Sequence, residues 1–305
     1  MQFRIREQEQ VKLIELVSDG NVLFAVAPEY GARLTQLALK HKGECHDLLW
    51  EASPEDCKTG AWSKNEILFP FPNRIEDGIY EYNGARYQLP INEKPFNNAL
   101  HGMVREAKFE VLAQDVRENK ASITLSYKYD GNQHYYPFAF TFDVTYTIEN
   151  NDTFTVIFDV KNDSEETLPF GIGWHPYFKL GESLEGVKLD IPKTDHLLLG
   201  ERNLPTGEEK PFDHTSLIVS EWNLDDCFRL REGEEAACQL FDDQLSLKMS
   251  GSPEYRYLQL FTPEGKGCVA VEPMTSGVNV FNNKEGLRLL EAGDQFSVSF
   301  KIALG

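Results

Sequence analysis

Apolar and polar residues alternate with a period of two along several stretches of the chain. The clearest stretch covers residues 138–148, where the apolar positions are Phe138, Phe140, Phe142, Val144, Tyr146 and Ile148. A period of two places every second side chain on one side of an extended strand. The pattern therefore predicts a strand of about eleven residues with one buried face.

A second alternating run, residues 154–160, follows after Asn150, Asn151 and Asp152. These three residues favour a turn, so the two runs predict a β-hairpin. The same alternation recurs over residues 123–129 and 296–302. Strands are therefore expected from residue 121 to the end of the chain.

Helical patterns are scarce, because no segment longer than ten residues combines an apolar stripe of helical spacing with capping residues. Only residues 56–67 suggest a short helical turn. No linker rich in Pro, Gly or Ser divides the chain, and no internal repeat is visible. We predict one all-β domain over residues 1–305, a large antiparallel β-sandwich, with a β-barrel as the alternative.

Composition narrows the class of partner. The net charge of −19 argues against nucleic acid, which needs clustered Lys and Arg, and suits a small neutral ligand. The N-terminal residues lack the apolar core of a signal peptide, and no stretch approaches the ~20 apolar residues of a membrane span. We expect a cytoplasmic protein that does not contact a membrane. Five scattered cysteines without a Cys-x-x-Cys pair predict free thiols.

Two residues are candidates for proton transfer. His175 precedes Pro176 and stands among aromatic residues, which suits the wall of a sugar site. Its alternative role is that of a core histidine bonded to a backbone carbonyl. Glu272 follows an apolar run and precedes Pro273, so it is expected at the end of a buried strand, where an unpaired carboxylate is costly. A histidine and a carboxylate readily exchange protons near neutral pH.

Two further segments, residues 69–75 and 97–102, are rich in turn formers and polar side chains. Arg74 offers a planar fork of donors for sugar hydroxyls or a carboxylate, or else forms a structural salt bridge. His101 either points into a site or is only a turn residue before Gly102. The chain lacks nucleotide-binding loops and a His-Glu-x-x-His motif, which disfavours nucleotide cofactors and catalytic zinc.

Taken together and in order, six motifs resemble those of the aldose 1-epimerase (galactose mutarotase) family. They are Asn73-Arg74, Leu100-His101-Gly102, His175-Pro176-Tyr177-Phe178, Leu224-Asp225-Asp226-Cys227-Phe228, Gln259 and Glu272-Pro273. The resemblance runs from about residue 20 to the C-terminus. It implies the family's large antiparallel β-sandwich and a cofactor-independent, metal-free interconversion of the α- and β-anomers of a free aldohexose of the glucose or galactose type.

The resemblance also implies roles for individual residues. His175 matches the family's general acid and Glu272 its general base, and the sugar-binding positions are Asn73, Arg74, His101, Asp225 and Gln259. The family often has Asp-His where this chain has Asp225-Asp226, so which aspartate faces the sugar is open. Because histidine is mostly neutral at pH 7, we expect one of these aspartates to stabilise a charge on His175.

Three alternatives remain at this point. A hexose 6-phosphate mutarotase would need a local cationic pocket, for which the candidates are Arg74, Arg105 and Lys64. A non-catalytic sugar-binding or sensory protein would not need a matched acid and base. A glycosidase usually has two carboxylates flanking the bond, whereas one carboxylate and one histidine are found here. The preferred sugar and the oligomeric state are not predicted.

Overall fold

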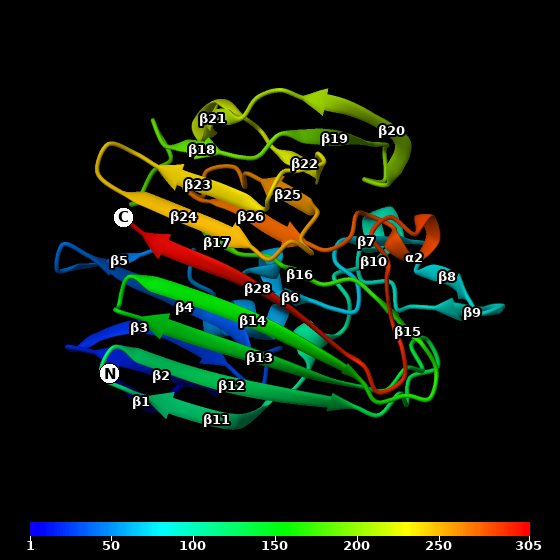
Figure 1. The fold of residues 1–305 in the computed structure, drawn as a ribbon, viewed down its shortest axis with the longest axis horizontal. Helices are drawn as coiled ribbons and strands as arrows, with labels where there is room; N and C mark the ends of the chain where they lie inside the picture. Colours follow the sequence, from blue (N-terminus) through cyan, green and yellow to red (C-terminus); the bar gives the residue numbers. More distant parts are fainter.

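The computed structural model describes all 305 residues and consists mainly of three antiparallel sheets (Figure 1). The largest sheet has the strand order β11-β12-β13-β14-β28-β24-β23-β18-β21. Its strands, in that order, are Glu110–Val116, Lys120–Tyr129, Phe140–Glu149, Thr153–Asn162, Gln295–Leu304, Ser246–Gly251, Ala237–Phe241, Lys188–Asp190 and Ser216–Ile218. We refer to it as the nine-stranded sheet.

The alternating runs of the sequence lie in this sheet, as β12, β13, β14 and β28. The strand predicted from the first run begins two residues later than expected, because β13 starts at Phe140 rather than Phe138. The predicted hairpin is confirmed, since β13 and β14 pair from Phe140↔Asn162 to Glu149↔Thr153. Asn150 and Asn151 form its turn with left-handed backbone angles, which Asn tolerates better than most residues.

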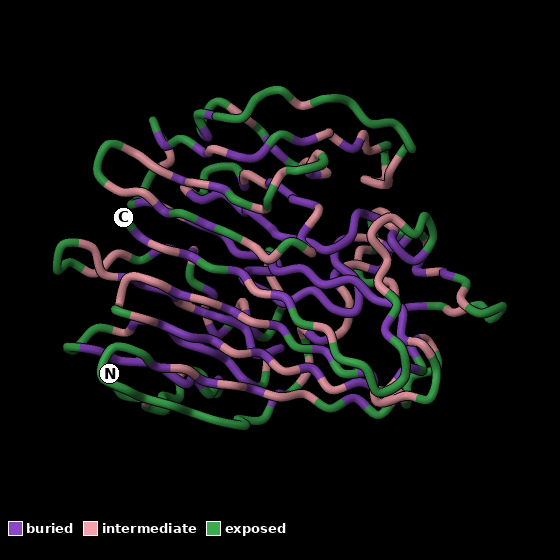
Figure 2. The backbone as a smooth tube through the Cα atoms, viewed as in Figure 1, coloured by how far each residue is buried: buried purple, intermediate pink, exposed green.

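A second sheet carries the candidate site and has the order β20-β19-β22-β25-β26-β16-β6, with β17 also paired to β26. We call it the eight-stranded sheet. Its strands are β20 Pro205–Phe212, β19 Thr194–Leu199, β22 Asp225–Leu230, β25 Tyr257–Phe261, β26 Val269–Met274, β16 Gly173–Trp174, β6 Ile67–Leu68 and β17 Tyr177–Phe178. The edge strands β20 and β11 are exposed along most of their length (Figure 2).

The third sheet contains β1 to β5, namely Gln2–Gln8, Val11–Ser18, Asn21–Ala27, Arg33–His41 and Glu44–Asp47. The expectation that strands begin near residue 121 was therefore incomplete. Strands β2, β3 and β4 are buried on both faces over most of their length, so they show no alternation of apolar and polar residues. Three small pairs complete the β-structure: β7 Arg74–Glu76 with β10 Asn98–Leu100, β8 Ile79–Tyr82 with β9 Ala85–Gln88, and β15 Leu168–Phe170 with β27 Arg288–Leu290.

One hydrophobic cluster of 65 buried residues joins the three large sheets. Phe154 of the nine-stranded sheet packs edge-on against Phe24 of the five-stranded sheet, with ring centroids 6.3 Å apart. On the same face of the nine-stranded sheet, Phe300 packs against Trp174 of the eight-stranded sheet at 6.0 Å. Buried segments accordingly fill the space between the layers in Figure 2. The predicted antiparallel sandwich is confirmed, and the barrel alternative is wrong because each sheet has two free edges.

Helices are few and short. The predicted turn at residues 56–67 is helix α1, which spans only Pro54–Thr59, followed by a 3₁₀ turn at Ala61–Ser63. It starts earlier than predicted because Ser53 caps it in a reciprocal capping box with Asp56, and Gly60 ends it in a left-handed conformation. The other helical elements are α2 Val280–Asn283 and 3₁₀ turns at Lys94–Phe96, Val104–Glu106 and Val219–Glu221. None of the helices is long and apolar enough to cross a membrane.

Candidate active site

A pocket of about 240 Å³ lies against the middle of the eight-stranded sheet, and all seven residues that the sequence analysis assigned to proton transfer or sugar binding line it. The lining consists of Gly60, Trp62, Ser63, Asn73, Arg74, Leu100, His101, His175, Tyr177, Asp225, Gln259, Phe261 and Glu272. A larger recess of about 650 Å³ lies beyond Leu100, which borders both cavities. That recess contains no histidine, so the acid–base candidates belong to the smaller pocket.

Strand register brings the residues of the sheet into the pocket. Glu272 in β26 is the direct neighbour of Gln259 in β25, so both side chains point to the same face. Asp225 in β22 is the neighbour of Phe261 and shares that face. Asp226 points to the opposite face, where its Oδ1 lies 2.8 Å from His196 Nε2. The aspartate that faces the pocket is therefore Asp225.

His175 and Glu272 face each other at the floor of the pocket. His175 Nε2 lies 3.3 Å from Glu272 Oε1, and both side chains are buried. His175 Nδ1 and Glu272 Oε2 have no hydrogen-bond partner in the protein. Because Nε2 faces a carboxylate, the alternative of a core histidine bonded to a backbone carbonyl does not describe His175. The backbone of His175 is held by Glu66, whose carbonyl accepts its N–H at 3.0 Å.

Burial shifts the two proton affinities in opposite directions. Burial, with a smaller contribution from the nearby positive charges of Arg105 and Arg74, lowers the pKa of His175 to about 3. Burial raises the pKa of Glu272 well above its usual 4.5. The negative charge of Asp225 raises this pKa further, whereas the positive charge of Arg74 lowers it. Both shifts arise because a charge loses hydration inside the protein. The carboxyl of Glu272 therefore holds a proton more readily than the imidazole of His175 does.

The expectation that an aspartate supports a charge on His175 was wrong. Asp225 accepts a hydrogen bond from Gln259 Nε2 at 3.2 Å, and Asp226 pairs with His196 on the other face of the sheet. Within the pocket, the acidic group that contacts the His175 ring is Glu272 itself. Strand alternation explains the outcome, since β22 directs only one of the two aspartates toward the pocket and places it beside β25.

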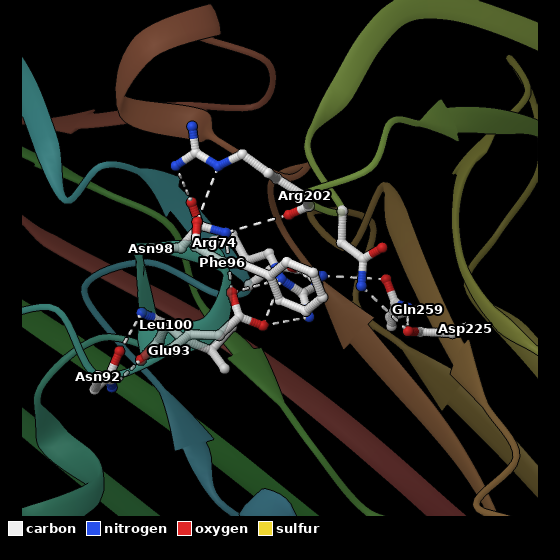
Figure 3. Close-up of polar contacts among 11 residues, drawn as sticks. Arg74, Asn92, Glu93, Phe96, Asn98, Leu100, Arg202, Asp225 and Gln259 are labelled. Atoms are coloured by element: carbon white, nitrogen blue, oxygen red, sulfur yellow. Dashed lines mark hydrogen bonds and ion pairs between the residues drawn. The ribbon is translucent and has the colours of Figure 1, made fainter.

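A chain of hydrogen bonds forms the polar wall of the pocket. Gln259 donates to Asp225 Oδ1, and Asn73 Nδ2 donates to Gln259 Oε1 at 3.1 Å. Arg74 Nη1 donates to Asn73 Oδ1 at 3.2 Å. The Nε and Nη2 atoms of Arg74 bind the carboxylate of Glu93 (Figure 3). Arg74 thus forms a structural salt bridge and also lines the pocket.

Sequence reasoning missed Glu93. Its carboxylate holds Arg74 at 2.8–3.0 Å and also accepts a hydrogen bond from Asn98 Nδ2 at 2.9 Å. Asn98 is in turn bound through its Oδ1 by Arg202 Nη2, at 3.1 Å (Figure 3). A lone Glu next to a Lys-Pro pair carries no signal in the sequence, because its partners come from different parts of the chain.

His101 also fits both of its readings. It adopts a left-handed backbone angle of φ 65° before Gly102, and its ring lies edge-on to His175 with centroids 5.2 Å apart. Burial, together with neighbouring His175, lowers its pKa well below 6.5. Gly102 is needed beside it, because a Cβ there would lie 2.1 Å from the carbonyl oxygen of Phe69.

Aromatic residues form the opposite wall. The Tyr177 ring stacks on the ring of His175 at 4.9 Å, and its hydroxyl donates to the Trp62 carbonyl at 2.8 Å. Phe261 lies edge-on to Tyr177 at 6.2 Å. Trp62 and Phe261 were not predicted, since neither stands in a motif or in a periodic pattern around a polar residue.

The positively charged side chains named as candidates for a phosphate pocket all form ion pairs with carboxylates of the protein. Arg105 Nη1 lies 3.2 Å from Glu66 Oε2, and Lys64 Nζ lies 2.9 Å from Asp56 Oδ2. Neither lines the pocket, and Arg74 is bound to Glu93. Of the three cations that the hexose 6-phosphate alternative would need, only Arg74 therefore lines this pocket. The chain contains no group of three His, Cys, Asp or Glu side chains placed to hold a metal ion.

Comparison with known proteins identifies the family. The aldose 1-epimerase family model matches residues 12–303. The uncharacterized protein YihR of Escherichia coli is 27% identical over 280 residues, 89% of this chain and 87% of that protein. Galactose mutarotase of Sus scrofa is 28% identical over 148 residues, 47% of this chain and 41% of that protein. The crystal structure of a galactose mutarotase-like protein from Clostridium acetobutylicum has a TM-score of 0.87 at 23% identity, covering 99% and 98% of the two chains. The chain therefore belongs to the aldose 1-epimerase family of isomerases.

Proposed function

We propose that this protein is a cofactor-independent mutarotase of a free aldohexose of the glucose or galactose type. The observation that carries the proposal is the contact between His175 Nε2 and Glu272 Oε1 at 3.3 Å, at the floor of a pocket whose walls offer hydrogen-bonding groups and aromatic rings. Such a pocket matches a pyranose, which has hydroxyls around its edge and C–H groups on its faces.

The reaction needs two proton transfers that balance each other. The C1 hydroxyl loses its proton, the bond between C1 and the ring oxygen breaks, and the ring oxygen gains a proton. The open aldehyde rotates about C1–C2, and the C5 hydroxyl then attacks the other face of the carbonyl. Ring closure reverses both transfers, so one base and one acid exchange roles in each cycle.

His175 and Glu272 can perform both transfers while the pair holds one proton in total, before and after ring opening. Glu272 as a carboxylate takes the proton of the C1 hydroxyl, and His175 as an imidazolium gives one to the ring oxygen. Ring opening thus ends with a protonated carboxyl and a neutral imidazole, which is the arrangement that burial favours in this pocket. The positive charge of Arg74 favours the carboxylate form of Glu272 that starts the reaction. Proton transfer by positioned groups typically accelerates a reaction ~10²–10⁴-fold.

The remaining polar residues are proposed to hold the sugar. Asn73, Gln259 and Asp225 are linked in one chain, so each amide has further donors or acceptors available for hydroxyls. Arg74 is kept in place by Glu93, and His101 borders the pocket next to His175. A fixed wall of this kind orients the sugar ring without large rearrangement.

Two alternatives receive less support. For a hexose 6-phosphate the pocket offers only Arg74 as a positively charged side chain, and that residue already faces a carboxylate. For a non-catalytic sugar-binding protein, a buried carboxylate facing a histidine would lower stability without aiding recognition. The geometry therefore favours catalysis on an uncharged sugar.

Polarimetry of freshly dissolved α-glucose, α-galactose and their 6-phosphates tests the proposal. We expect the wild type to accelerate mutarotation of a free sugar. In Glu272→Gln, kcat/KM should fall about 10²–10⁴-fold. The control is Glu285→Gln, which removes a half-buried carboxylate that also has a raised pKa but does not line the pocket. Unchanged activity in Glu272→Gln would contradict the mechanism. Acceleration of phosphosugars alone would contradict the substrate.

A further inference from the structure

Two arginines that line one cavity lack a carboxylate partner. The chain contains twelve arginines, and nine of them form ion pairs with Asp or Glu side chains. The other three are Arg86, Arg256 and Arg288. Arg86 is exposed on β9, whereas Arg256 and Arg288 are half-buried and line the same cavity. A partly desolvated guanidinium without a counter-ion is costly, and it is unexpected in a chain of net charge −19.

This cavity, which we call the arginine cavity, is separate from the candidate active site. It has a volume of about 450 Å³ and shares no lining residue with the pocket of His175 and Glu272. Its lining comes from β22 and the turn after it, from the start of β25 and from the segments before and after α2. Arg229 also lines it but is paired with Glu209. The one carboxylate of the lining belongs to exposed Glu232, so the half-buried charges in the cavity are positive.

The Arg256 guanidinium is fixed by the backbone and keeps two free donors. Its Nη1 donates to the Glu234 carbonyl at 2.8 Å. Its Nη2 donates to the carbonyls of Leu230 and Arg231, both at 2.9 Å. Because a guanidinium has five N–H groups, the Nε–H and one Nη1–H remain without an acceptor in the protein. The carbonyl contacts hold the group in place and leave its charge uncompensated, so Arg256 is preorganised for an anion.

Arg288 is held by fewer contacts. Its guanidinium lies 5.4 Å from the ring centroid of Phe296, and its Nη2 donates to the Glu254 carbonyl at 3.4 Å. Four of its five N–H groups therefore have no acceptor in the protein. The contact with the Phe296 ring leaves the positive charge in place. Arg288 can thus direct its planar fork to a ligand oxygen without breaking an ion pair.

Two neutral donors add to the arginine cavity. Thr275 is 1% exposed, and its Oγ1 accepts the Ile172 N–H at 2.9 Å, while its hydroxyl proton has no acceptor in the protein. Gly286 also lines the cavity, and its backbone N–H has no acceptor in the protein either. A glycine is needed for this close approach, because a Cβ there would lie 2.6 Å from the Thr275 carbonyl oxygen. Free donors from four residues therefore line one cavity.

The number and kind of these donors favour a phosphate group. A phosphate group presents three strong acceptor oxygens, and arginine binds them through its planar fork. A carboxylate has only two oxygens and so satisfies fewer of the four donor residues. The volume of about 450 Å³ falls within the ~300–1,000 Å³ of small-molecule sites, so the rest of an organic phosphate fits beside its phosphate group.

We propose that the arginine cavity binds a phosphate-bearing small molecule, with Arg256 and Arg288 as its cationic ligands. The Thr275 hydroxyl and the Gly286 N–H donate to the remaining phosphate oxygens. The site lies outside the candidate active site, and it does not depend on the proposed mutarotase function.

Isothermal titration calorimetry of the full chain with inorganic phosphate and with glycerol 3-phosphate tests this site, at an ionic strength kept constant with sodium chloride. We expect saturable binding of one phosphate group per chain. In Arg288→Gln the dissociation constant should rise about 10–100-fold, because hydrogen bonds from a charged group are lost. Arg288 is the residue to change, since the loss of Arg256 would also release three backbone carbonyls. The matched control is Arg86→Gln, which removes the third unpaired arginine and should bind phosphate as the wild type does.

The comparison of ligands identifies the source of the phosphate group. Tighter binding of glycerol 3-phosphate than of inorganic phosphate supports an organic phosphate as the ligand, and equal or weaker binding supports free phosphate. Acetate that binds as tightly as phosphate would overturn the choice of ligand class.

The absence of saturable binding would overturn the site itself. Binding that Arg288→Gln leaves unchanged would overturn it as well, and its loss in Arg74→Gln would then place the phosphate in the candidate active site. No sugar is present in these titrations, so each result leaves the mutarotase proposal to its own test by polarimetry.

Discussion

The nine-stranded sheet and the centre of the eight-stranded sheet bury different kinds of residue. In β13 and β14, the buried positions facing the core are almost all apolar, as with Phe142 and Phe158, which are fully buried. In the eight-stranded sheet, β26 is also buried throughout, yet it contains Glu272, and its neighbour β25 contains buried Gln259. Apolar burial stabilises the fold by about 25 cal/mol per Å², whereas a buried carboxylate with an unpartnered oxygen lowers its stability.

The difference indicates where the molecule can tolerate such groups. The strands that carry the polar floor of the pocket direct their other face, including Leu260 and Val271, into the core of 65 residues, so the stability of the whole sandwich can offset a few desolvated charges. The same lack of water shifts the pKa of His175 and of Glu272 in opposite directions. Changes in the two regions should therefore separate stability from activity.

The largest effect on stability is expected from Phe158→Ala in the nine-stranded sheet. Phe158 is fully buried and packs against Phe142 with ring centroids 6.0 Å apart. Its truncation leaves a cavity and should lower the free energy of unfolding by about 3–5 kcal/mol, measured by urea denaturation. Activity per folded molecule should be retained. The control is Leu112→Ala on exposed β11, expected within about 0.5 kcal/mol of the wild type. Loss of activity without loss of stability in Phe158→Ala would contradict the separation of stability and activity between the two sheets.

The same contrast explains which strands the sequence reveals. Strands with one wet face, such as β12 and β13, alternate between apolar and polar residues and are predicted directly. Strands buried on both faces, such as β3 and β26, are nearly continuous apolar runs. A run of that kind does not distinguish a strand from a buried helix, and it does not identify the sheet to which a strand belongs.

Parts of the site were predictable for a related reason. Glu272 and His175 stand out because each is polar within an apolar segment, and the order of the motifs supplied their neighbours. The link between Asn73 and Gln259 joins residues 186 positions apart, and the position of Glu93 against Arg74 depends on how two loops pack. Such contacts exist only after folding. Trp62 could not be predicted for the same reason, because neither its exposure nor its backbone angle has a local signature in the sequence.

A smaller effect, on binding rather than folding, is expected from Glu93→Gln. The substitution keeps the shape of the side chain but removes the charge that holds the Arg74 guanidinium. Hydrogen bonds to charged groups contribute about 1.5–3 kcal/mol, so KM for the sugar should rise about 10–100-fold with a smaller change in kcat. Glu76→Gln is the control, because Glu76 is an exposed partner of Arg202 outside the pocket. Steady-state polarimetry measures both constants, and an equal KM in the two variants would contradict a positioning role for Glu93.

The finest distinction concerns pH and the stability of Glu272→Gln. Because the pKa of Glu272 is raised in the folded protein, the native state keeps a proton that the unfolded chain releases above pH 4.5, and this group makes stability fall as pH rises. His175, with a pKa lowered to about 3 from 6.5, acts in the opposite direction between these values and has no effect above them. Removing the carboxyl should therefore make the variant increasingly more stable than the wild type from pH 4.5 upward, by at most about 1.4 kcal/mol per pH unit. Unfolding midpoints measured from pH 4.5 to 8 test this directly, since parallel curves for the two proteins would mean that the carboxyl at the pocket floor is as well solvated when folded as when unfolded.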